Sequence, residues 1–261
     1  MSSSFPRWVW IPFALALSLL AVPLLGMLTR VSWAELPALL TSERALDALR
    51  LSLITCTIST IIVVTVGVPT ALVLARMNGW WTDVVRTLVT VPMVLPPVVA
   101  GLALLVTFGR RGLIGEHLSA MGIEIGFTTI AVVIAQSFVS LPFLITAVEG
   151  ALRTSSSELE KVAATLGASP SRIFWRVTLP VIRPALASGT ALAFARSLGE
   201  FGATLTFAGS LQGTTRTLPL EIYLLRESDS DIALALALVL IVVALAIVLL
   251  STRLRGAGEN G

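Results

Sequence analysis

Charged side chains are scarce in this sequence. Only 13% of its 261 residues are Asp, Glu, Lys or Arg, whereas 56% are hydrophobic. Soluble globular proteins carry about 25% charged residues. So few charges cannot cover the exterior of a soluble domain of this length. The composition therefore predicts a membrane protein and disfavours a soluble enzyme.

Lysine, cysteine and histidine each occur once, and each scarcity excludes a class of site. Lys161 lies between Glu160 and Val162, so the chain lacks the Gly-Lys-Ser/Thr of a phosphate-binding P-loop, and ATP hydrolysis would need another polypeptide. Cys56 cannot form an internal disulfide, and His117 cannot build a histidine-rich metal site. A net charge of +3 without a basic block disfavours nucleic acid as a partner. We therefore expect no catalytic residue and no metal ligand.

Long apolar runs predict an all-α membrane protein with six spans. A bilayer core of about 30 Å needs roughly 20 apolar residues per helix. Five uncharged runs meet this length, and a sixth run carries Arg196 and Glu200 inside it: Trp8–Leu28, Leu51–Ala75, Thr87–Phe108, Phe127–Val148, Ile232–Leu250 and the charged Ala185–Ala208. Residues 1–255 are expected to form one transmembrane domain, followed by a short tail at 256–261.

Basic residues in the loops predict the orientation. One side of the membrane would hold ten Lys and Arg residues, in the N-terminus, 76–86, 149–183 and the tail. The opposite side would hold seven, in 29–50, 109–126 and 209–231. Because cytoplasmic loops carry the excess of basic residues, both termini are predicted to be cytoplasmic.

Prolines interrupt several predicted spans. Each proline removes a backbone donor and can kink its helix, which membrane proteins tolerate where neighbouring helices or a cavity satisfy the freed carbonyls. Single prolines are common in membrane helices and need no function. The general frequency of proline in membrane helices does not readily explain the adjacent pair Pro96-Pro97. We therefore take this pair as a candidate part of a pathway.

The loop at 149–183 has the pattern of two short helices outside the membrane. Ser155, Ser156 and Ser157 can cap the first, which would carry an apolar stripe of Leu159, Val162, Ala163 and Leu166 and end at Gly167. Ser169 and Pro170 can begin the second, and Pro180 is expected to stop it. Such an element suits the docking of a partner. The alternative is an amphipathic helix lying on the membrane surface.

Two segments of this loop resemble the EAA loop of ABC importer permeases. They are Lys-Val-Ala-Ala-Thr-Leu-Gly at 161–167 and Val-Thr-Leu-Pro at 177–180. The family's glutamate position falls on Lys161, and Glu160 lies one residue earlier. The resemblance implies a cytoplasmic coupling loop at about 153–183 whose helix, about Glu158–Gly167, fits a cleft on a separate ATPase. The implied docking residues are Glu158, Glu160, Lys161, Ala163, Ala164, Gly167, Leu179 and Pro180.

Two further stretches resemble the molybdate branch of these permeases. They are Val94–Gly101 continuing to Gly112, and Ala195–Thr204 with the Thr-Leu-Pro at 217–219. Sulfate and thiosulfate permeases are similar around the second stretch, so molybdate is the first choice, and sulfate, thiosulfate and tungstate remain alternatives. The resemblance implies a type I importer fold and a homodimer in the inner membrane. It also implies ATPase subunits that bind ATP and Mg, an external oxyanion-binding protein, surrounding lipid, and no cofactor on this chain.

Arg196 and Glu200 are one helical turn apart inside a predicted span, where an ion pair lowers the cost of two charges. They form either an anion contact or a structural clasp between helices, and an anion contact would require the pair to open. The pathway candidates are Pro96, Pro97, Ser140, Arg196, Glu200 and Thr204. Gly199, Gly202 and Gly209 are expected to permit a helix break or close packing. Glu149 is expected only to be solvated at the membrane interface.

A secondary transporter driven by an ion gradient is the alternative from another class. Arg196 and Glu200 would then be the coupling groups. The organised loop at 149–183 argues against it, because such a transporter needs no ATPase docking element.

Overall fold

The structure is a computed structural model that describes residues 6–155 and 158–259. Five helices are long and apolar enough to cross a membrane, and a bent pair of shorter helices makes six if it is counted as one span. The long helices are α1 (Trp10–Leu28), α3 (Glu43–Arg76), α7 (Thr129–Thr154), α10 (Leu179–Leu198) and α13 (Ser230–Glu259). The shorter ones are η1 (Arg7–Val9), α2 (Leu36–Leu40), α4 (Trp80–Val94), α5 (Pro97–Phe108), α6 (Gly115–Ala120), α8 (Glu158–Thr165), α9 (Pro170–Ile173), η2 (Phe174–Thr178), α11 (Gly202–Ala208) and α12 (Leu218–Ser228).

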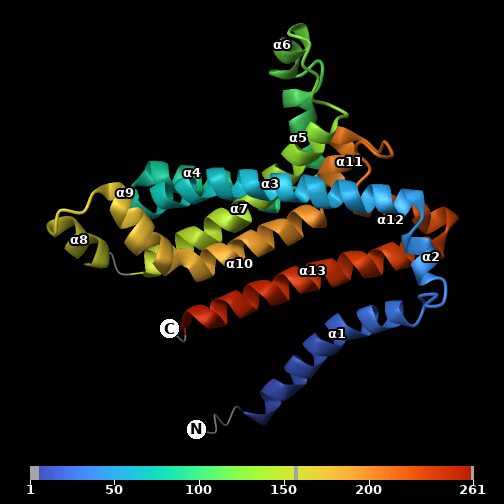
Figure 1. Ribbon diagram of the computed structural model, residues 1–261, viewed down its shortest axis with the longest axis horizontal. Coiled ribbons are helices and arrows are strands. Elements are labelled where there is room, and N and C mark those ends of the chain that lie inside the picture. The colour runs from blue at the N-terminus through green and yellow to red at the C-terminus, as the bar shows by residue number, and fades with distance from the viewer. Residues whose placement is uncertain (1–5, 156–157, 260–261) are drawn as a thin grey trace.

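Four long helices, α3, α7, α10 and α13, form the bundle (Figure 1). Its main apolar core joins α3, α7 and α10, with Val63, Leu144, Ile145, Val148 and Ile182 fully or almost fully buried. Side-chain caps fix where two of these helices begin, because Ser42 accepts the backbone N–H of Ala45 and Thr128 accepts that of Ala131. The prediction of an all-α membrane fold is confirmed.

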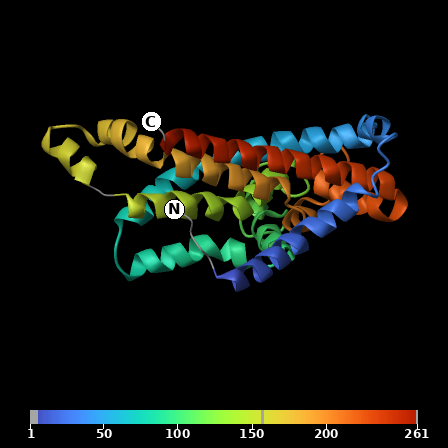
Figure 2. The same ribbon diagram turned by 90° about the horizontal axis from the view of Figure 1, so that it is seen from below.

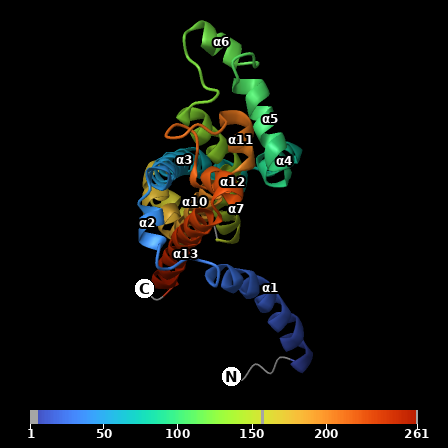
Figure 3. The ribbon, with the colours of Figure 1, turned by 90° about the vertical axis from the view of Figure 1, so that its right-hand side faces the viewer.

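Two parts of the chain stand away from the bundle. In the end-on view of Figure 3, α1 lies on one side and the arm of α5 and α6 projects on the other. No residue of α1 is buried. The predicted coupling loop at about 153–183, which we call the docking loop, leaves one end of the bundle. Helix α12 lies toward the opposite end, as Figure 2 shows. The bundle therefore has two ends that differ in structure.

The predicted span Thr87–Phe108 is not one helix. It is divided between α4 and α5, whose axes differ by 115°. Leu95 and Pro96 are extended, with ψ of 133° and 135°, and Pro97 begins α5. A proline pushes the residue before it out of the helical region and donates no backbone hydrogen bond. Two prolines in succession therefore end one helix and start another.

The predicted span Ala185–Ala208 is also wrong in its bounds. Its helix begins at Leu179 and ends at Leu198, and α11 is a separate short helix after the break at Gly199–Phe201. Pro180 does not stop the preceding helix, because α9, η2 and α10 run on as one apolar span from Pro170 to Leu198. The wide turn of η2 lies directly before Pro180, which occupies the first turn of α10, where its missing N–H costs least.

Candidate functional site

The two helix breaks lie against each other. A Cβ added to Gly202, at the start of α11, would lie 2.6 Å from the Cβ of Pro97, at the start of α5. A Cβ added to Gly101 would lie 2.6 Å from the Cβ of Thr206. Glycine at both positions thus allows α5 and α11 to pack at close range. This agrees with the expected packing role of Gly202 and brings Pro96 and Pro97 next to the break in the charged span.

Arg196 and Glu200 form the predicted ion pair across the end of α10, with 2.7 Å between Nη1 and Oε2. The Glu200 side chain is 1% exposed, whereas that of Arg196 is 28% exposed. The second carboxylate oxygen of Glu200 accepts the backbone N–H of Ala203 at 2.8 Å, in the first turn of α11. Glu200 therefore holds the break between α10 and α11, and Arg196 keeps a partly open guanidinium beside it.

The hydroxyl candidates near this break are buried. Thr204 lies on α11 with its side chain fully buried, and its hydroxyl has no partner within the described residues. Ser140 is also fully buried, and its hydroxyl donates to the carbonyl of Gln136 one turn earlier in α7. Such bonding to the preceding turn is common for serine in membrane helices. Thr204 is thus the candidate whose bonding capacity is unused.

A cavity of about 460 Å³ opens beside the break. Its walls are mostly apolar and come from the break itself, α12 and α13: Phe201, Pro219, Ile222, Tyr223, Arg226, Ser230, Ala233, Leu234 and Ala237. The centroid of the Tyr223 ring lies 4.9 Å from that of the Phe201 ring. The Arg226 guanidinium lies over the Tyr223 ring, 4.9 Å from its centroid. Our sequence analysis missed Tyr223 and Arg226, although Tyr223 is the only tyrosine and precedes Arg226 by three residues on a helix.

Two polar contacts hold α12, which carries those residues. The backbone N–H of Leu218 donates to the Ser52 hydroxyl of α3 at 2.7 Å. The buried Glu221 accepts a hydrogen bond from Arg216 at 3.4 Å. Arg216 also bonds the hydroxyl and the carbonyl oxygen of Ser210, which closes the loop after α11. The wall of the cavity is therefore fixed to the bundle.

The first predicted helix of the docking loop is α8, whereas the second is not a separate short helix, because α9 continues through η2 into α10. Ser156 and Ser157, which were predicted to cap α8, lie outside the described residues. The backbone of Gly167 has φ of +81°, and the N–H groups of Gly167 and Ala168 bond the carbonyls of Ala164 and Ala163. This pattern ends a helix and favours glycine. Leu159, Val162 and Leu166 are all exposed, and Leu166 reaches 83%. The helix α8 thus presents an uncovered apolar face beyond the end of the bundle.

Glu160 turns inward from α8. Its carboxylate lies 3.0 Å from Nη2 of Arg76, at the end of α3, and accepts the Thr178 hydroxyl of η2. Lys161, which occupies the motif's glutamate position, is exposed, and so are Glu158 and Ala164. The remaining predicted docking residues differ in exposure: Ala163 and Leu179 are half-buried, whereas Gly167 and Pro180 are exposed. Glu160, which lies one residue before the motif's glutamate position, therefore attaches α8 to the bundle.

Glu149 does not have the solvated position that we expected. Its side chain is 7% exposed, and its Oε1 lies 2.9 Å from Arg86 of α4 and 3.2 Å from Arg153 of α7. A buried carboxylate is costly unless it is paired. Glu149 is therefore a buried partner of two arginines and not a solvated surface residue. Arg86 lies 63 residues away in sequence, so no local pattern could reveal the pair.

Comparisons with known proteins agree on one family. The family described as "Binding-protein-dependent transport system inner membrane component" matches residues 67–256. The chain is 56% identical to the molybdenum transport system permease protein ModB of Mycobacterium tuberculosis, with 87% of this chain and 86% of that protein covered. It is 34% identical to the sulfate transport system permease protein CysT of Escherichia coli, with 79% and 75% covered.

A solved structure has the same fold. A chain of a bacterial alginate ABC transporter, crystallised with an alginate pentasaccharide-bound periplasmic protein, superposes with a TM-score of 0.71. The alignment covers 93% of this chain and 92% of that chain at 20% identity. The similarity therefore extends over nearly the whole chain.

Proposed function

Because the chain belongs to the family of binding-protein-dependent transport system inner membrane components, we propose that it is the permease subunit of an ATP-driven molybdate importer. Members of this family are transport subunits, and the chain itself catalyses no bond chemistry. The observation that carries the substrate assignment is the 56% identity to a molybdenum permease over 87% of the chain. The identity to a sulfate permease is 34%, so sulfate is the second candidate.

The pathway forms between two copies of this chain. Helices α4 and α5 expose a run of apolar side chains that one copy leaves uncovered: Leu88, Val94, Val98, Leu102 and Val106. The arm of α5 and α6 also projects beyond its own bundle (Figure 1). A second copy on this side would cover these side chains and place two α4–α5 breaks face to face. Broken helices at a repeat or subunit interface are typical of substrate pathways.

Arg196 contacts the oxyanion in transit. Its guanidinium has five N–H donors in a planar fork, and the bond to Glu200 uses only one edge of that fork. The side chain is 28% exposed. The other donors are therefore accessible while the pair stays closed, so the anion does not need to open the pair, which differs from our expectation from the sequence. Pro96 and Pro97, which are exposed, form the adjacent wall. The Thr204 hydroxyl is unpaired but fully buried, so it does not face the anion in this conformation.

The docking loop receives a separate ATPase. The exposed apolar face of α8 supports this assignment, because such a face outside the bilayer needs a partner to cover it. ATP and Mg bind on that partner. An external oxyanion-binding protein delivers the anion at the opposite end of the bundle. In the inner membrane, both termini lie on the cytoplasmic side with α8, which agrees with the excess of basic loop residues on that side.

The test is ATP hydrolysis and anion uptake by the complete complex in proteoliposomes. The complex contains this permease, its ATPase and the external binding protein, which is loaded in turn with molybdate, tungstate or sulfate. We expect molybdate to stimulate hydrolysis several-fold and to accumulate inside the vesicles. Stimulation by sulfate without stimulation by molybdate would overturn the substrate assignment.

The same vesicles separate the two classes of transporter. The permease reconstituted without its ATPase should transport no oxyanion under an imposed ion gradient. Gradient-driven uptake by the permease alone would instead establish a secondary transporter, with Arg196 and Glu200 as its coupling groups.

A further inference from the structure

Four charged side chains form a cluster where α4 meets α7. Glu149 of α7 accepts hydrogen bonds from Arg86 of α4, whose Nε lies 3.0 Å from Oε1. Arg153 pairs with Glu149 from one turn farther along α7, and Asp83 pairs with Arg86 from one turn earlier in α4. The two positive and two negative charges balance. Glu149 is the buried member, since Asp83 is 75% exposed and Arg153 is 45% exposed.

This cluster is the polar attachment of α4 to the bundle. Thr82 is the one buried residue of α4, and several of its apolar side chains face outward. Helix α4 packs against α7 and, to a lesser extent, α3. Across residues 6–155 and 158–259, the pair of Arg86 and Glu149 is the one ion pair that joins α4 to another helix. Its loss would leave α4 held by a narrow apolar contact.

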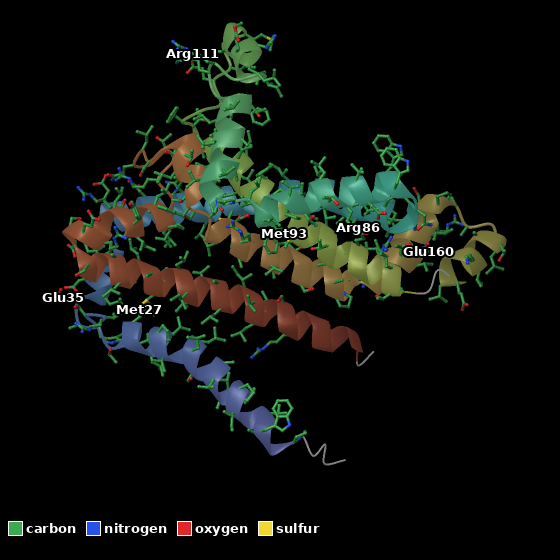
Figure 4. The ribbon with its side chains drawn as sticks, turned by 180° about the vertical axis from the view of Figure 1, so that it is seen from behind. Met27, Glu35, Arg86, Met93, Arg111 and Glu160 are labelled. Atoms are coloured by element: carbon green, nitrogen blue, oxygen red, sulfur yellow. The ribbon has the colours of Figure 1, made fainter. Side chains whose placement is uncertain are left out.

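The position of Glu149 along the chain links two sites. It lies five residues before the end of α7 at Thr154, and α8 begins at Glu158. On the other helix, α4 continues through the break at Leu95 and Pro96 into α5, which packs against α11. Figure 4 shows Arg86 toward the end of the bundle that carries Glu160 and α8. The buried pair therefore joins α4 to the part of α7 that lies toward the α8 end of the bundle.

Helix α8 has a separate attachment to α3. Glu160 pairs with Arg76 at 3.0 Å and accepts the Thr178 hydroxyl. This contact fixes the orientation of α8 against α3 and η2, and α3 packs along α7, which carries Glu149. Glu160 therefore attaches α8 to α3, and Glu149 attaches α7 to α4, so both acidic residues lie on one path of contacts from α8 to α4.

We propose that Glu149 and Arg86 are a positioning pair that transmits the movement of the docking helix α8 to α4 and α5, and so couples ATP binding to opening of the pathway. The proposal rests on the proposed function as an ATP-driven importer. Neither residue touches the anion. The pair acts by making α4 follow the end of α7, because buried charges that lose their partner are strongly disfavoured.

The first test compares coupling in the complete complex with molybdate-loaded binding protein. Glu149→Gln and Arg86→Gln should each lower the number of anions imported per ATP hydrolysed at least fivefold, while ATP hydrolysis continues. The double variant Glu149→Gln with Arg86→Gln leaves neither residue of the pair as an unpaired buried charge, and it should stay uncoupled because the ion pair that joins the two helices is gone. Asp83→Asn is the matched control, since it removes the exposed charge and leaves the buried pair intact.

The second test measures the movement of α4 directly and does not depend on high transport activity. Cys56 is the only cysteine, so a Cys56→Ser background accepts spin labels at Val84→Cys on α4 and Val73→Cys on α3, both exposed. ATP binding to the complex should change the distance between the labels. Arg86→Gln should abolish that change.

Each outcome decides the proposal. An unchanged ratio of import to hydrolysis in both single variants would overturn it, as would a label distance that responds to ATP equally with Gln at position 86. A double variant that couples import to hydrolysis as well as the original complex would also overturn it. If the unaltered complex shows no stimulation by its loaded binding protein, the proposed function itself fails, which is a separate result.

Discussion

Every buried carboxylate in the described part of the chain has an arginine beside it. Glu149, Glu200 and Glu221 are each at least nine-tenths buried, and each lies within 3.4 Å of a guanidinium nitrogen. Removing water from an unpaired carboxylate is costly, so removing one partner of a buried pair destabilises a protein by about 3–5 kcal/mol. The pairs of Glu149 and Glu200 therefore fix how α4 and α11 attach to the bundle, and the pair of Glu221 joins α12 to the loop before it.

Replacement of Arg196 tests whether it contacts the anion. Arg196→Gln should lower the initial rate of molybdate uptake at least tenfold, because an amide offers fewer donors and no charge to the oxyanion. Arg196→Lys should retain an intermediate rate, since it keeps the charge and loses the planar fork. The measurement is uptake by the reconstituted complex, with size-exclusion chromatography to check assembly.

A double variant guards against a folding defect in the single one. In Arg196→Gln with Glu200→Gln, neither residue is left as an unpaired buried charge, so the break between α10 and α11 should keep its shape. Uptake should remain low. Normal uptake by the double variant would show that Arg196 acts only as a clasp.

Sequence spacing predicted one of these pairs and missed the others. Arg196 and Glu200 are four residues apart, so a helical turn brings them together wherever the helix lies. Arg86 and Glu149 meet only because α4 packs against α7, and that packing depends on tertiary contacts between distant apolar side chains. Hydropathy also placed Glu149 near the membrane surface, where a carboxylate is usually solvated.

At the scale of helices, the two breaks differ in how visible they are in the sequence. Pro96-Pro97 marks the end of α4, because two prolines restrict the backbone on both sides of the break. The angle of 115° depends on the packing of α5 against α11, which no local rule supplies. The break at Gly199–Phe201 lies between two apolar runs. The mean hydropathy of a window across it therefore stays high, and the two helices were predicted as one span. The end of α8 was predicted correctly, because a glycine end is a local signal. The end predicted at Pro180 was wrong, because η2 joins α9 to α10.

A glycine replacement tests the close contact between α5 and α11. Gly202→Ala places a Cβ 2.6 Å from the Pro97 Cβ, and such overpacking destabilises by about 1–3 kcal/mol. Gly150→Ala is the matched control, because an added Cβ there meets nothing within 4 Å and should stabilise α7 by about 0.5–1 kcal/mol. Thermal unfolding of the purified permease should therefore shift in opposite directions. Equal shifts for the two variants would contradict the close packing.

At the scale of the whole molecule, apolar composition correctly predicted a multi-pass helical protein but not the shape of one copy. Helix α1 is long enough to span the membrane, yet no residue of it is buried and it contributes to none of the three apolar core clusters. The arm of α5 and α6 likewise projects from the bundle. Hydropathy reports that a helix prefers an apolar medium, and it cannot distinguish lipid from another protein surface.

Removal of α1 should leave the rest of the fold intact. A variant that starts at Arg30 loses no residue of the apolar core, so its free energy of unfolding should change by less than about 1 kcal/mol, which corresponds to about 2–4 °C in Tm for a domain of this size. Circular dichroism during heating of the purified protein in detergent measures this. A fall of more than about 10 °C would show that α1 contributes to the stability of the bundle.

The contact between Gly202 and Pro97 has a mechanical consequence. Because α5 and α11 pack closely and share an apolar core with the first half of α7, these three segments form one packed unit. The breaks at Leu95-Pro96 and Gly199–Phe201 join this unit to α4 and α10. A force applied through α4 therefore acts on α5, α11 and the first half of α7 together, and not on α5 alone.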